Sequence, residues 1–223
     1  MKVIMTGGGT GGHIYPAVAI ADEIKQRCEG VEILFVGAEI GLEKDLVPKC
    51  GYNIELIQAD GFNRKKLMNN FVAIKRIMNG NKRAKEILKE YKPDMVIGTG
   101  GYASMPVTRA AQKMGIPTYV HEQNAFPGLT NKMLERKANN VFLGFGAASE
   151  YFKCPEKHVT VGNPVRDTFI NADREEARAS LGFKEDDFVL LAFGGSQGAG
   201  RINKAMMKVI ETFNGMENFK IIL

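Results

Sequence analysis

Short runs of apolar residues recur along the chain, separated by segments in which apolar residues are spaced as on one face of a helix. The runs begin at residues 2, 31, 52, 94, 117, 139, 158 and 188, and read KVIMT, VEILFVG, YNIELI, DMVIGTG, PTYVHEQ, NNVFLGF, HVTVG and FVLLAFGG. Runs of this length and apolar content predict buried strands. Strands that alternate with helices predict an α/β fold, a parallel sheet covered by helices on both faces.

The first helical pattern follows the first strand. In PAVAIADEIKQRC, the residues Val18, Ile20, Ala21 and Ile24 are spaced as on one helical face. We expect the helix to begin near Pro16, because proline is well suited to a first helical turn.

A polar segment over residues 163–187 predicts a boundary between two Rossmann-like domains, near Arg166 to Asp173. We therefore expect domains at residues 1–165 and 166–223. The last residues, NFKIIL, have the composition of a strand with no helix after it. Because a parallel strand normally feeds a crossover helix, this ending predicts that the second domain is truncated after its first β-α-β unit.

Composition narrows the class of protein. The 223 residues include 25 glycines, with 44% hydrophobic and 25% charged residues, which is typical of a soluble globular protein. The net charge of +5 favours phosphates, anionic membrane surfaces or nucleic acid as partners. Cys28, Cys50 and Cys154 lack the spacing of a disulfide framework or a zinc site, which indicates a reducing compartment and no metal. With no signal peptide or membrane span, we expect a soluble cytoplasmic protein.

Three glycine-rich segments each follow a predicted strand. They are GGGTGGH from Gly7, GTGGYAS from Gly98 and FGGSQGAG from Phe193. Glycines there let backbone N–H groups approach a ligand, and a following helix N-terminus favours phosphate. The first segment also matches GxGxxG, a weak dinucleotide-binding signal, and a tight turn without a ligand explains a single such loop equally well.

The repetition of such loops favours a ligand site. The carboxyl ends of parallel strands share one edge, so Thr10, the turn at residues 99–101 and the polar residues His121 to Asn124 are expected at one crevice. Two domains with glycine-rich turns fit an enzyme that handles two phosphorylated molecules. An NAD-dependent oxidoreductase with Glu39 at the ribose is the enzyme alternative.

A non-enzymatic nucleic-acid-binding module is a third hypothesis. It is suggested only by the isoelectric point of about 9.0. The sequence has no helix-turn-helix, RNA-recognition or zinc signature, so nucleic acid is not expected as a partner.

The motifs GGTGGHIYPA, GTGGYAS, HEQNAFPGLTNK, GNPVR and GGSQGA, in this order, resemble those of the MurG family of glycosyltransferases. The resemblance implies the GT-B fold, which has two Rossmann-like domains, and no metal or other cofactor. It also implies an inverting hexosyltransferase that moves N-acetylglucosamine from UDP-N-acetylglucosamine to lipid I, forming lipid II for peptidoglycan. Such an enzyme is peripheral, on the cytoplasmic face of an anionic cell membrane.

The resemblance also implies roles for individual residues. The positions that match the family's donor site are Thr10, Gly11, Gly12, Asn124, Arg166 and Ser196. Those expected to hold the acceptor diphosphate are Gly9, His13, Thr99, Gly100, Gly101 and Tyr102. The family's uracil- and ribose-binding segments lie beyond Leu223, so the implied activity is that of the longer protein.

An inverting transfer needs a base that removes the proton of the acceptor hydroxyl. His13, at the end of the first loop, is the first candidate for this base, or for a partner of the acceptor phosphate. Glu122 is the second candidate. Alternatively, His13 caps the turn, and Glu122 is a structural carboxylate that accepts backbone N–H groups.

A basic amphipathic segment begins at Arg64. Its apolar residues Leu67, Phe71, Ile74 and Met78 are spaced as on a helix, beside cations that include Lys75 and Arg76. This pattern is typical of a surface helix packed on a sheet, and also of a helix in a membrane interface. A break is expected at Asn79-Gly80-Asn81, which would confine membrane docking to the residues before it.

Overall fold

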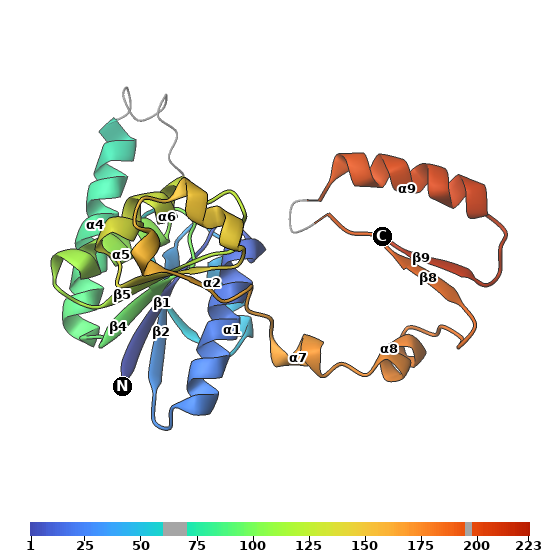
Figure 1. Ribbon diagram of the computed structural model, residues 1–223, viewed down its shortest axis with the longest axis horizontal. Coiled ribbons are helices and arrows are strands. Elements are labelled where there is room, and N and C mark those ends of the chain that lie inside the picture. Colours follow the sequence, from blue (N-terminus) through green and yellow to red (C-terminus); the bar gives the residue numbers. More distant parts are fainter. Residues whose placement is uncertain (60–70, 195–197) are drawn as a thin grey trace. The chain divides into compact units, whose positions relative to one another are not determined.

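The computed structural model describes residues 1–59, 71–194 and 198–223, without the side chains of residues 71–74. The chain divides into two compact units, Met1–Arg166 and Asp167–Leu223. Figure 1 shows both units.

The first unit is built on a seven-stranded sheet with the order β3-β2-β1-β4-β5-β6-β7, in which all neighbouring strands are parallel. Each strand forms where an apolar run predicts it. In chain order the strands are β1 (Lys2–Thr6), β2 (Glu32–Ala38), β3 (Asn53–Ile57), β4 (Met95–Gly98), β5 (Thr118–Glu122), β6 (Asn140–Leu143) and β7 (His158–Thr160).

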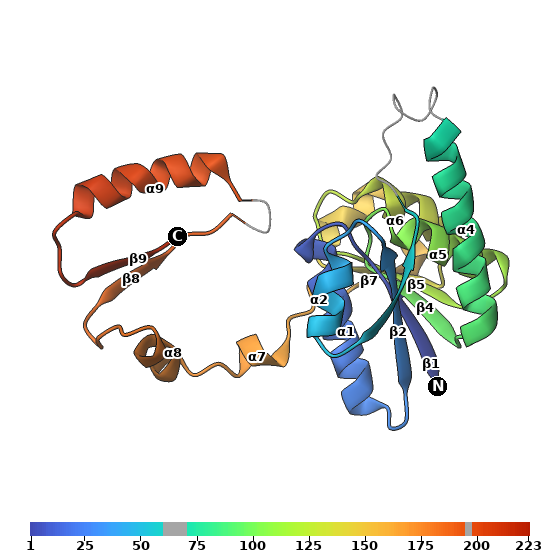
Figure 2. The same ribbon diagram turned by 180° about the vertical axis from the view of Figure 1, so that it is seen from behind.

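Helices cover both faces of this sheet, as expected from the alternation of strands and helices (Figure 2). The helices of the first unit are α1 (Gly11–Arg27), α2 (Glu43–Lys49), α4 (Phe71–Tyr91), α5 (Ser104–Lys113) and α6 (Leu129–Leu134), with short 3-10 turns η1 (Glu135–Lys137), η2 (Gly146–Tyr151) and η3 (Pro155–Lys157). The predicted α/β fold class is confirmed.

Two separate apolar clusters show why both faces need helices. Successive residues of a strand point to opposite faces. In β1, Val3 and Met5 belong to a cluster with Ile14 of α1, whereas Ile4 belongs to another cluster with Leu88 of α4. All five side chains are buried, so residues 3–5 of β1 are all apolar because neither face of the strand meets solvent there.

The strand order reverses direction between β1 and β4, which makes the carboxyl ends of these strands the expected ligand site. From β1 the chain builds outward to β3, then crosses over to β4 on the other side of β1. Thr6 of β1 pairs with Gly98 of β4, and Gly98 pairs with Val120 of β5. Ligands of open α/β sheets bind outside the carboxyl ends of the strands at such a switch point.

The start of α1 differs from the expectation. The helix begins at Gly11, five residues before Pro16. Pro16 therefore lies in the second turn, where it leaves the carbonyl oxygen of Gly12 without its usual intrahelical donor. The difference matters for the site, because Gly11, Gly12 and His13 form the first helical turn instead of a loop.

The expected break at Asn79-Gly80-Asn81 is wrong, because α4 is continuous from Phe71 to Tyr91. Gly80 serves close packing instead. A Cβ atom there would lie 1.9 Å from the carbonyl oxygen of Gln58, the residue after β3. No helix in the described part of the chain is long and apolar enough to cross a membrane.

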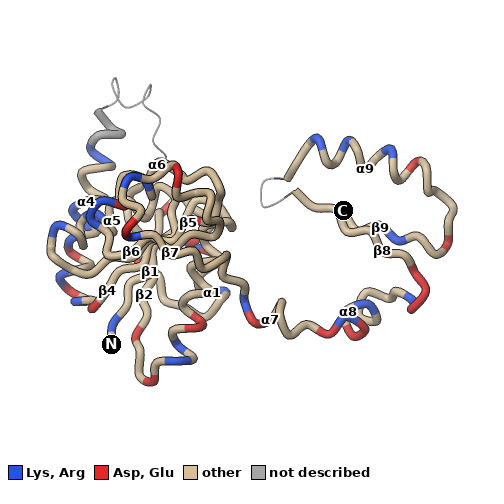
Figure 3. Tube along the Cα trace, in the orientation of Figure 1, with Lys and Arg blue, Asp and Glu red and all other residues tan. Residues whose placement is uncertain are grey.

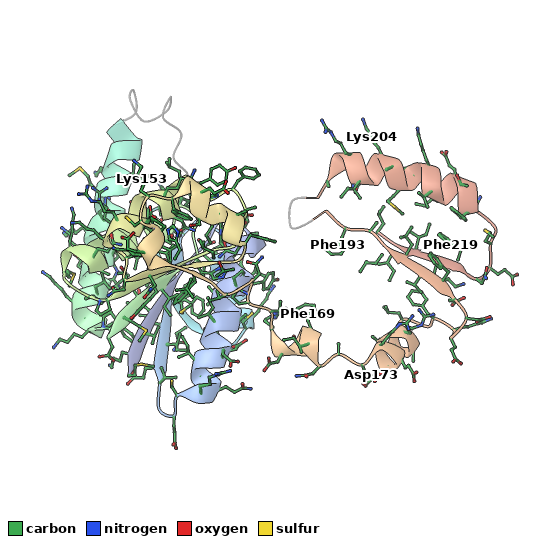
Figure 4. All side chains as sticks on the ribbon, viewed as in Figure 1. Lys153, Phe169, Asp173, Phe193, Lys204 and Phe219 are labelled. Carbon is green, nitrogen blue, oxygen red and sulfur yellow. The ribbon has the colours of Figure 1, made fainter. Side chains whose placement is uncertain are left out.

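The second unit contains a two-stranded parallel sheet, β8 (Phe188–Leu191) and β9 (Phe219–Ile222), joined by α9 (Gly200–Phe213). Two short helices, α7 (Asp167–Ile170) and α8 (Arg174–Ser180), precede it. The ring of Phe219 stacks on Phe188 and Phe213, with centroids 5.2 and 4.4 Å away. Lys204 points from α9 away from these strands (Figure 4), so the helix packs one face on them.

Replacing Gly80 with alanine tests the close packing of α4. We expect Gly80→Ala to lower the free energy of unfolding by about 1–3 kcal/mol, since the added methyl group overlaps the backbone of Gln58. Urea denaturation would measure the change. The control Lys85→Ala removes an exposed side chain from the same helix and should leave stability nearly unchanged. A Gly80→Ala protein as stable as the wild type would contradict this account.

Candidate active site

Three loops meet at the carboxyl edge of the sheet, after the adjacent strands β1, β4 and β5. The amide of Thr99 donates to the carbonyl of Thr6 at 2.9 Å, and the amide of Gly8 donates to the carbonyl of Gly100 at 3.3 Å. A Cβ atom on Gly101 would lie 2.1 Å from the carbonyl oxygen of Gly8. The loops after β1 and β4 are therefore packed backbone against backbone, which requires glycine at residue 101.

A buried carboxylate, Glu43 of α2, supports the first glycine-rich loop. Its side chain is fully buried. Its Oε2 atom accepts a hydrogen bond from the amide of Gly9 at 2.9 Å, and its Oε1 atom accepts one from the amide of Ala38 at 2.8 Å. The sequence reasoning missed Glu43, because an acidic residue in a first helical turn is common on surfaces and no local pattern shows that it points inward.

Glu43 also changes what Gly9 can do. The amide of Gly9 was expected to bind the acceptor diphosphate, but in this structure it already donates to Glu43. The aromatic ring of Tyr102 packs against Gly9, so that a Cβ atom on Gly9 would lie 2.7 Å from the Cε1 atom of Tyr102. Gly9 and Tyr102 lie together, as expected. The contacts of Gly9 are with the side chains of Glu43 and Tyr102.

The first turn of α1 is more open than Gly9. Thr10 is the residue before the helix, and its carbonyl accepts from the amides of His13 and Ile14 at 3.1 and 3.2 Å. The side chain of Thr10 forms no capping hydrogen bond. Gly12 is exposed, and only the Oγ1 atom of Thr10, at 3.7 Å, approaches the position of its missing Cβ atom. This turn is open to a phosphate, which a helix N-terminus favours.

His13 joins the three loops. Its Nδ1 atom lies 3.0 Å from the carbonyl oxygen of Thr99 and 3.1 Å from the Oε1 atom of Gln123. In return, the hydroxyl of Thr99 donates to the carbonyl of His13 at 2.7 Å. His13 is half-buried, and among the described residues no hydrogen-bond partner is found for its Nε2 atom.

The carboxylate of Glu122 is committed to its own loop. It is buried, and its Oε1 atom accepts from the amide of Asn124 at 3.0 Å and from its side-chain nitrogen at 2.9 Å. Its Oε2 atom accepts from the amide of Gly128 at 3.0 Å and from Asn131 at 2.8 Å. Glu122 thus shapes the loop after β5, and both of its oxygens are occupied.

Glu122 also orients Asn124, whose side chain is exposed. Because the Nδ2 atom of Asn124 donates to the carboxylate, its Oδ1 atom points the other way. Asn131 of α6 is a further residue that the sequence reasoning did not single out. It is buried, and donates to Glu122 and, at 3.2 Å, to the carbonyl of His121.

The segment GNPVR folds back onto the loop after β5. The side chain of Asn163 donates to the carbonyl of Gln123 at 3.1 Å. Arg166 follows, and its guanidinium lies 5.0 Å from the ring centre of Tyr15 on α1, a cation–π contact. Arg166 is therefore held beside α1, the helix whose first turn contains His13.

Comparison with known proteins identifies the family. The model of the glycosyltransferase family 28 N-terminal domain matches residues 3–143, which include all three loops. The chain belongs to glycosyltransferase family 28. This membership supports the glycosyltransferase hypothesis over the oxidoreductase and nucleic-acid-binding alternatives.

Similar proteins agree with this family. A curated relative from Acetivibrio thermocellus is 47% identical over 222 residues, covering 100% of this chain and 60% of the relative. One from Thermoanaerobacter sp. (strain X514) is 47% identical, covering 95% and 58%. Both are named UDP-N-acetylglucosamine–N-acetylmuramyl-(pentapeptide) pyrophosphoryl-undecaprenol N-acetylglucosamine transferase.

A solved structure confirms the expected fold. The crystal structure of MurG from Acinetobacter baumannii is 28% identical, with a TM-score of 0.69 over 96% of this chain and 58% of that protein. The resemblance to MurG glycosyltransferases with the GT-B fold is thus confirmed. The chain spans about 60% of the length of the curated relatives it matches.

The remaining predicted residues of this family 28 chain fall into three groups. Ser196 and Leu67 fall outside the described residues, and the side chains of Phe71 and Ile74 are not described. On α4, Lys75 is exposed, Arg76 is half-buried and Met78 is 65% exposed. Gly100 and Gly101 lie at the crevice, both with positive φ, of 98° and 79°.

Glu43→Gln tests the support of the glycine-rich loop. The amide group of glutamine must turn one N–H toward a backbone donor, so we expect a loss of about 1–3 kcal/mol in the free energy of unfolding. Hydrogen exchange of the Gly9 amide should also become faster. Asp45→Asn makes the same change at an exposed position of α2 and serves as the control. Unchanged exchange at Gly9 in the Glu43→Gln protein would show that the carboxylate does not hold the loop.

The buried His121 predicts a pH dependence of stability. Burial lowers the pKa of His121, and the hydrogen bond to the carbonyl of Gly162 and the charge of Glu122 only partly oppose this shift. The unfolded chain then binds a proton that the folded chain does not, so stability is full above the unfolded pKa of about 6.5 and falls as the pH drops below it. Urea denaturation between pH 8 and pH 5 would measure this. Stability that rises over this interval on acidification would contradict the assignment.

Proposed function

We propose that the first unit, Met1–Arg166, is the acceptor domain of an N-acetylglucosaminyltransferase, and that residues from Asp167 begin its UDP-sugar domain. The longer protein would move N-acetylglucosamine from UDP-N-acetylglucosamine to the muramoyl sugar of lipid I, with inversion and without a metal. The names of the relatives and the membership of family 28 support this reaction. The alternatives gain no support from the site.

The observation that carries the mechanism is the position of His13. Its Nδ1 atom is hydrogen-bonded to Thr99 and Gln123, which leaves Nε2 as the basic atom at the junction of the three loops. We propose that Nε2 takes the proton of the acceptor hydroxyl. At the same time the hydroxyl oxygen attacks the anomeric carbon of the donor N-acetylglucosamine. The bond from that carbon to UDP breaks, and the electron pair leaves with UDP. Glu122 is not proposed as the base, because its oxygens are already hydrogen-bonded.

Phosphate groups have two candidate positions. The first turn of α1, with Thr10, Gly11 and Gly12, offers backbone N–H groups and the positive end of a 17-residue helix. The turn with Gly100 and Gly101 lies against it through the contact with Gly8. We propose that the turn with Gly100 and Gly101 binds the acceptor diphosphate, with Tyr102 alongside, and that Thr10, Gly11 and Gly12 contact the UDP-sugar.

The donor sugar would be bound by Asn124 and the donor phosphate by Arg166. Asn124 presents a carbonyl oxygen to solvent, which suits a sugar hydroxyl. A guanidinium binds a phosphate through two parallel hydrogen bonds. Ser196 is expected to join them from the second unit, as the family resemblance implies.

An apolar groove beside the diphosphate site supports membrane attachment. It holds about 250 Å³ between α4, α5 and α6, and its lining includes Tyr102, Ile77, Met105, Leu129 and Met133. Lysine and arginine residues lie along α4 (Figure 3), and Lys75 and Met78 are exposed. Exposed apolar and basic residues together favour an anionic bilayer surface. We propose a peripheral position on the cytoplasmic face of the membrane.

His13→Gln in the longer protein tests the reaction. We expect kcat for transfer of labelled sugar to a lipid I analogue to fall about 10²- to 10⁴-fold, as for loss of a general base. The KM for UDP-N-acetylglucosamine should change little. Lys113→Ala, an exposed change on α5, is the control and should leave the rate unchanged. A wild-type protein without transfer activity would overturn the proposed function, and an active His13→Gln protein would overturn the role of His13.

A further inference from the structure

Gln123 connects two histidines. Its Oε1 atom lies 3.1 Å from Nδ1 of His13, and its Nε2 atom lies 3.0 Å from Nδ1 of His121. The side chain is 8% exposed, and Nε2 also donates to the carbonyl of His121 at 3.2 Å. A single buried amide therefore bridges the candidate base and a second, fully buried imidazole.

The two ends of this chain of hydrogen bonds determine where the protons lie. At one end, the Nδ1 atom of His13 faces the carbonyl of Thr99; at the other, the Nε2 atom of His121 faces the carbonyl of Gly162 at 3.0 Å. A carbonyl oxygen can only accept a hydrogen bond. Nδ1 of His13 and Nε2 of His121 must therefore both carry protons.

The orientation of the amide follows from these protons. A neutral His121 with a proton on Nε2 has a lone pair on Nδ1, so Gln123 must turn its NH₂ group toward that atom. Its oxygen then faces the N–H of His13. In this arrangement each N–H group of the two rings and of the amide faces an acceptor. The series runs from the carbonyl of Gly162 through His121, Gln123 and His13 to the carbonyl of Thr99. No other arrangement with a neutral His121 achieves this.

We propose that Gln123 is a positioning residue that, together with the carbonyls of Thr99 and Gly162, holds His13 and His121 in opposite tautomers, so that His13 presents a basic Nε2 atom. His13 can take up a proton on Nε2 without any change in these hydrogen bonds, because its Nδ1 atom is already a donor. Protonation of His121, by contrast, would place an N–H against the NH₂ group of Gln123. The chain thus directs proton uptake to His13. Its use in transfer rests on the proposed function, whereas the tautomers do not.

Nuclear magnetic resonance of ¹⁵N-labelled protein tests the tautomers directly. The chain has 3 histidines, so each imidazole can be assigned. Long-range ¹H–¹⁵N correlation at neutral pH should show the proton on Nδ1 of His13 and on Nε2 of His121. If both rings carry the same tautomer, or each the reverse of this assignment, the proposal is wrong.

Two substitutions separate the role of Gln123 from that of the carbonyls. Gln123→Met keeps the length of the side chain but forms no such hydrogen bonds. It leaves the carbonyl of Thr99 as the one remaining acceptor of the two that face Nδ1 of His13, and should therefore weaken the preference of His13 for the Nδ1-protonated form, so that some of the Nε2-protonated form appears. Gln123→Glu places a carboxylate between the rings, and should raise the pKa of His121 and protonate its Nδ1 atom at a pH where the wild type is neutral. Glu122 is the other charged side chain close to His121, and it is unchanged in both proteins.

His158 is the internal control. His158 takes no part in the hydrogen bonds that link His13, Gln123 and His121. It is hydrogen-bonded to Ser149 at 2.7 Å and to Glu135 at 2.8 Å. Its signals should be the same in all three proteins if the first unit is folded. Unchanged spectra of His13 and His121 in both variants would overturn the positioning role. In the longer protein, Gln123→Glu should move the acidic limb of the kcat–pH profile to higher pH, and absence of all transfer would affect only the proposed function.

Discussion

Polar groups at the carboxyl ends of β1, β4 and β5 are buried, and each must find a partner inside the protein. The carboxylates of Glu43 and Glu122 and the amide of Gln123 meet this requirement with hydrogen bonds to loops. An unpaired group there would cost about 1–3 kcal/mol, so these contacts restrict the loops to one arrangement. The rigidity of the candidate site follows from the satisfaction of these groups.

The same constraint divides the polar residues into two kinds. Residues whose side-chain oxygens all accept hydrogen bonds within the loops, such as Glu122, shape the loops without reaching a ligand. Other residues have one polar atom hydrogen-bonded within the protein and a second polar atom available to a ligand. In His13 the bonded atom is Nδ1, and in Asn124 it is Nδ2. A preorganised site needs both kinds, because an atom held in place loses little conformational entropy on binding.

Much of the fold was predictable from local pattern. Each apolar run forms a strand, and the buried parts of β1 and β4 are apolar because helices cover both faces of the sheet there. The position of the candidate site follows from the carboxyl ends of the strands. The start of α1 and the continuity of α4 were not predictable. Pro16 is compatible with a first or a second turn, and Gly80 can break a helix or let it approach a backbone, depending on neighbours distant in sequence.

The sequence by itself determined the α/β fold, the family and the group of loops in which His13, Thr99 and Asn124 lie. Only the tertiary structure decided the task of each side chain in that group. It paired Glu43 with Gly9 across 34 residues and His13 with Gln123 across 110. Apolar periodicity is a local property of the chain, whereas the partner of a buried polar atom depends on which segments the sheet brings together.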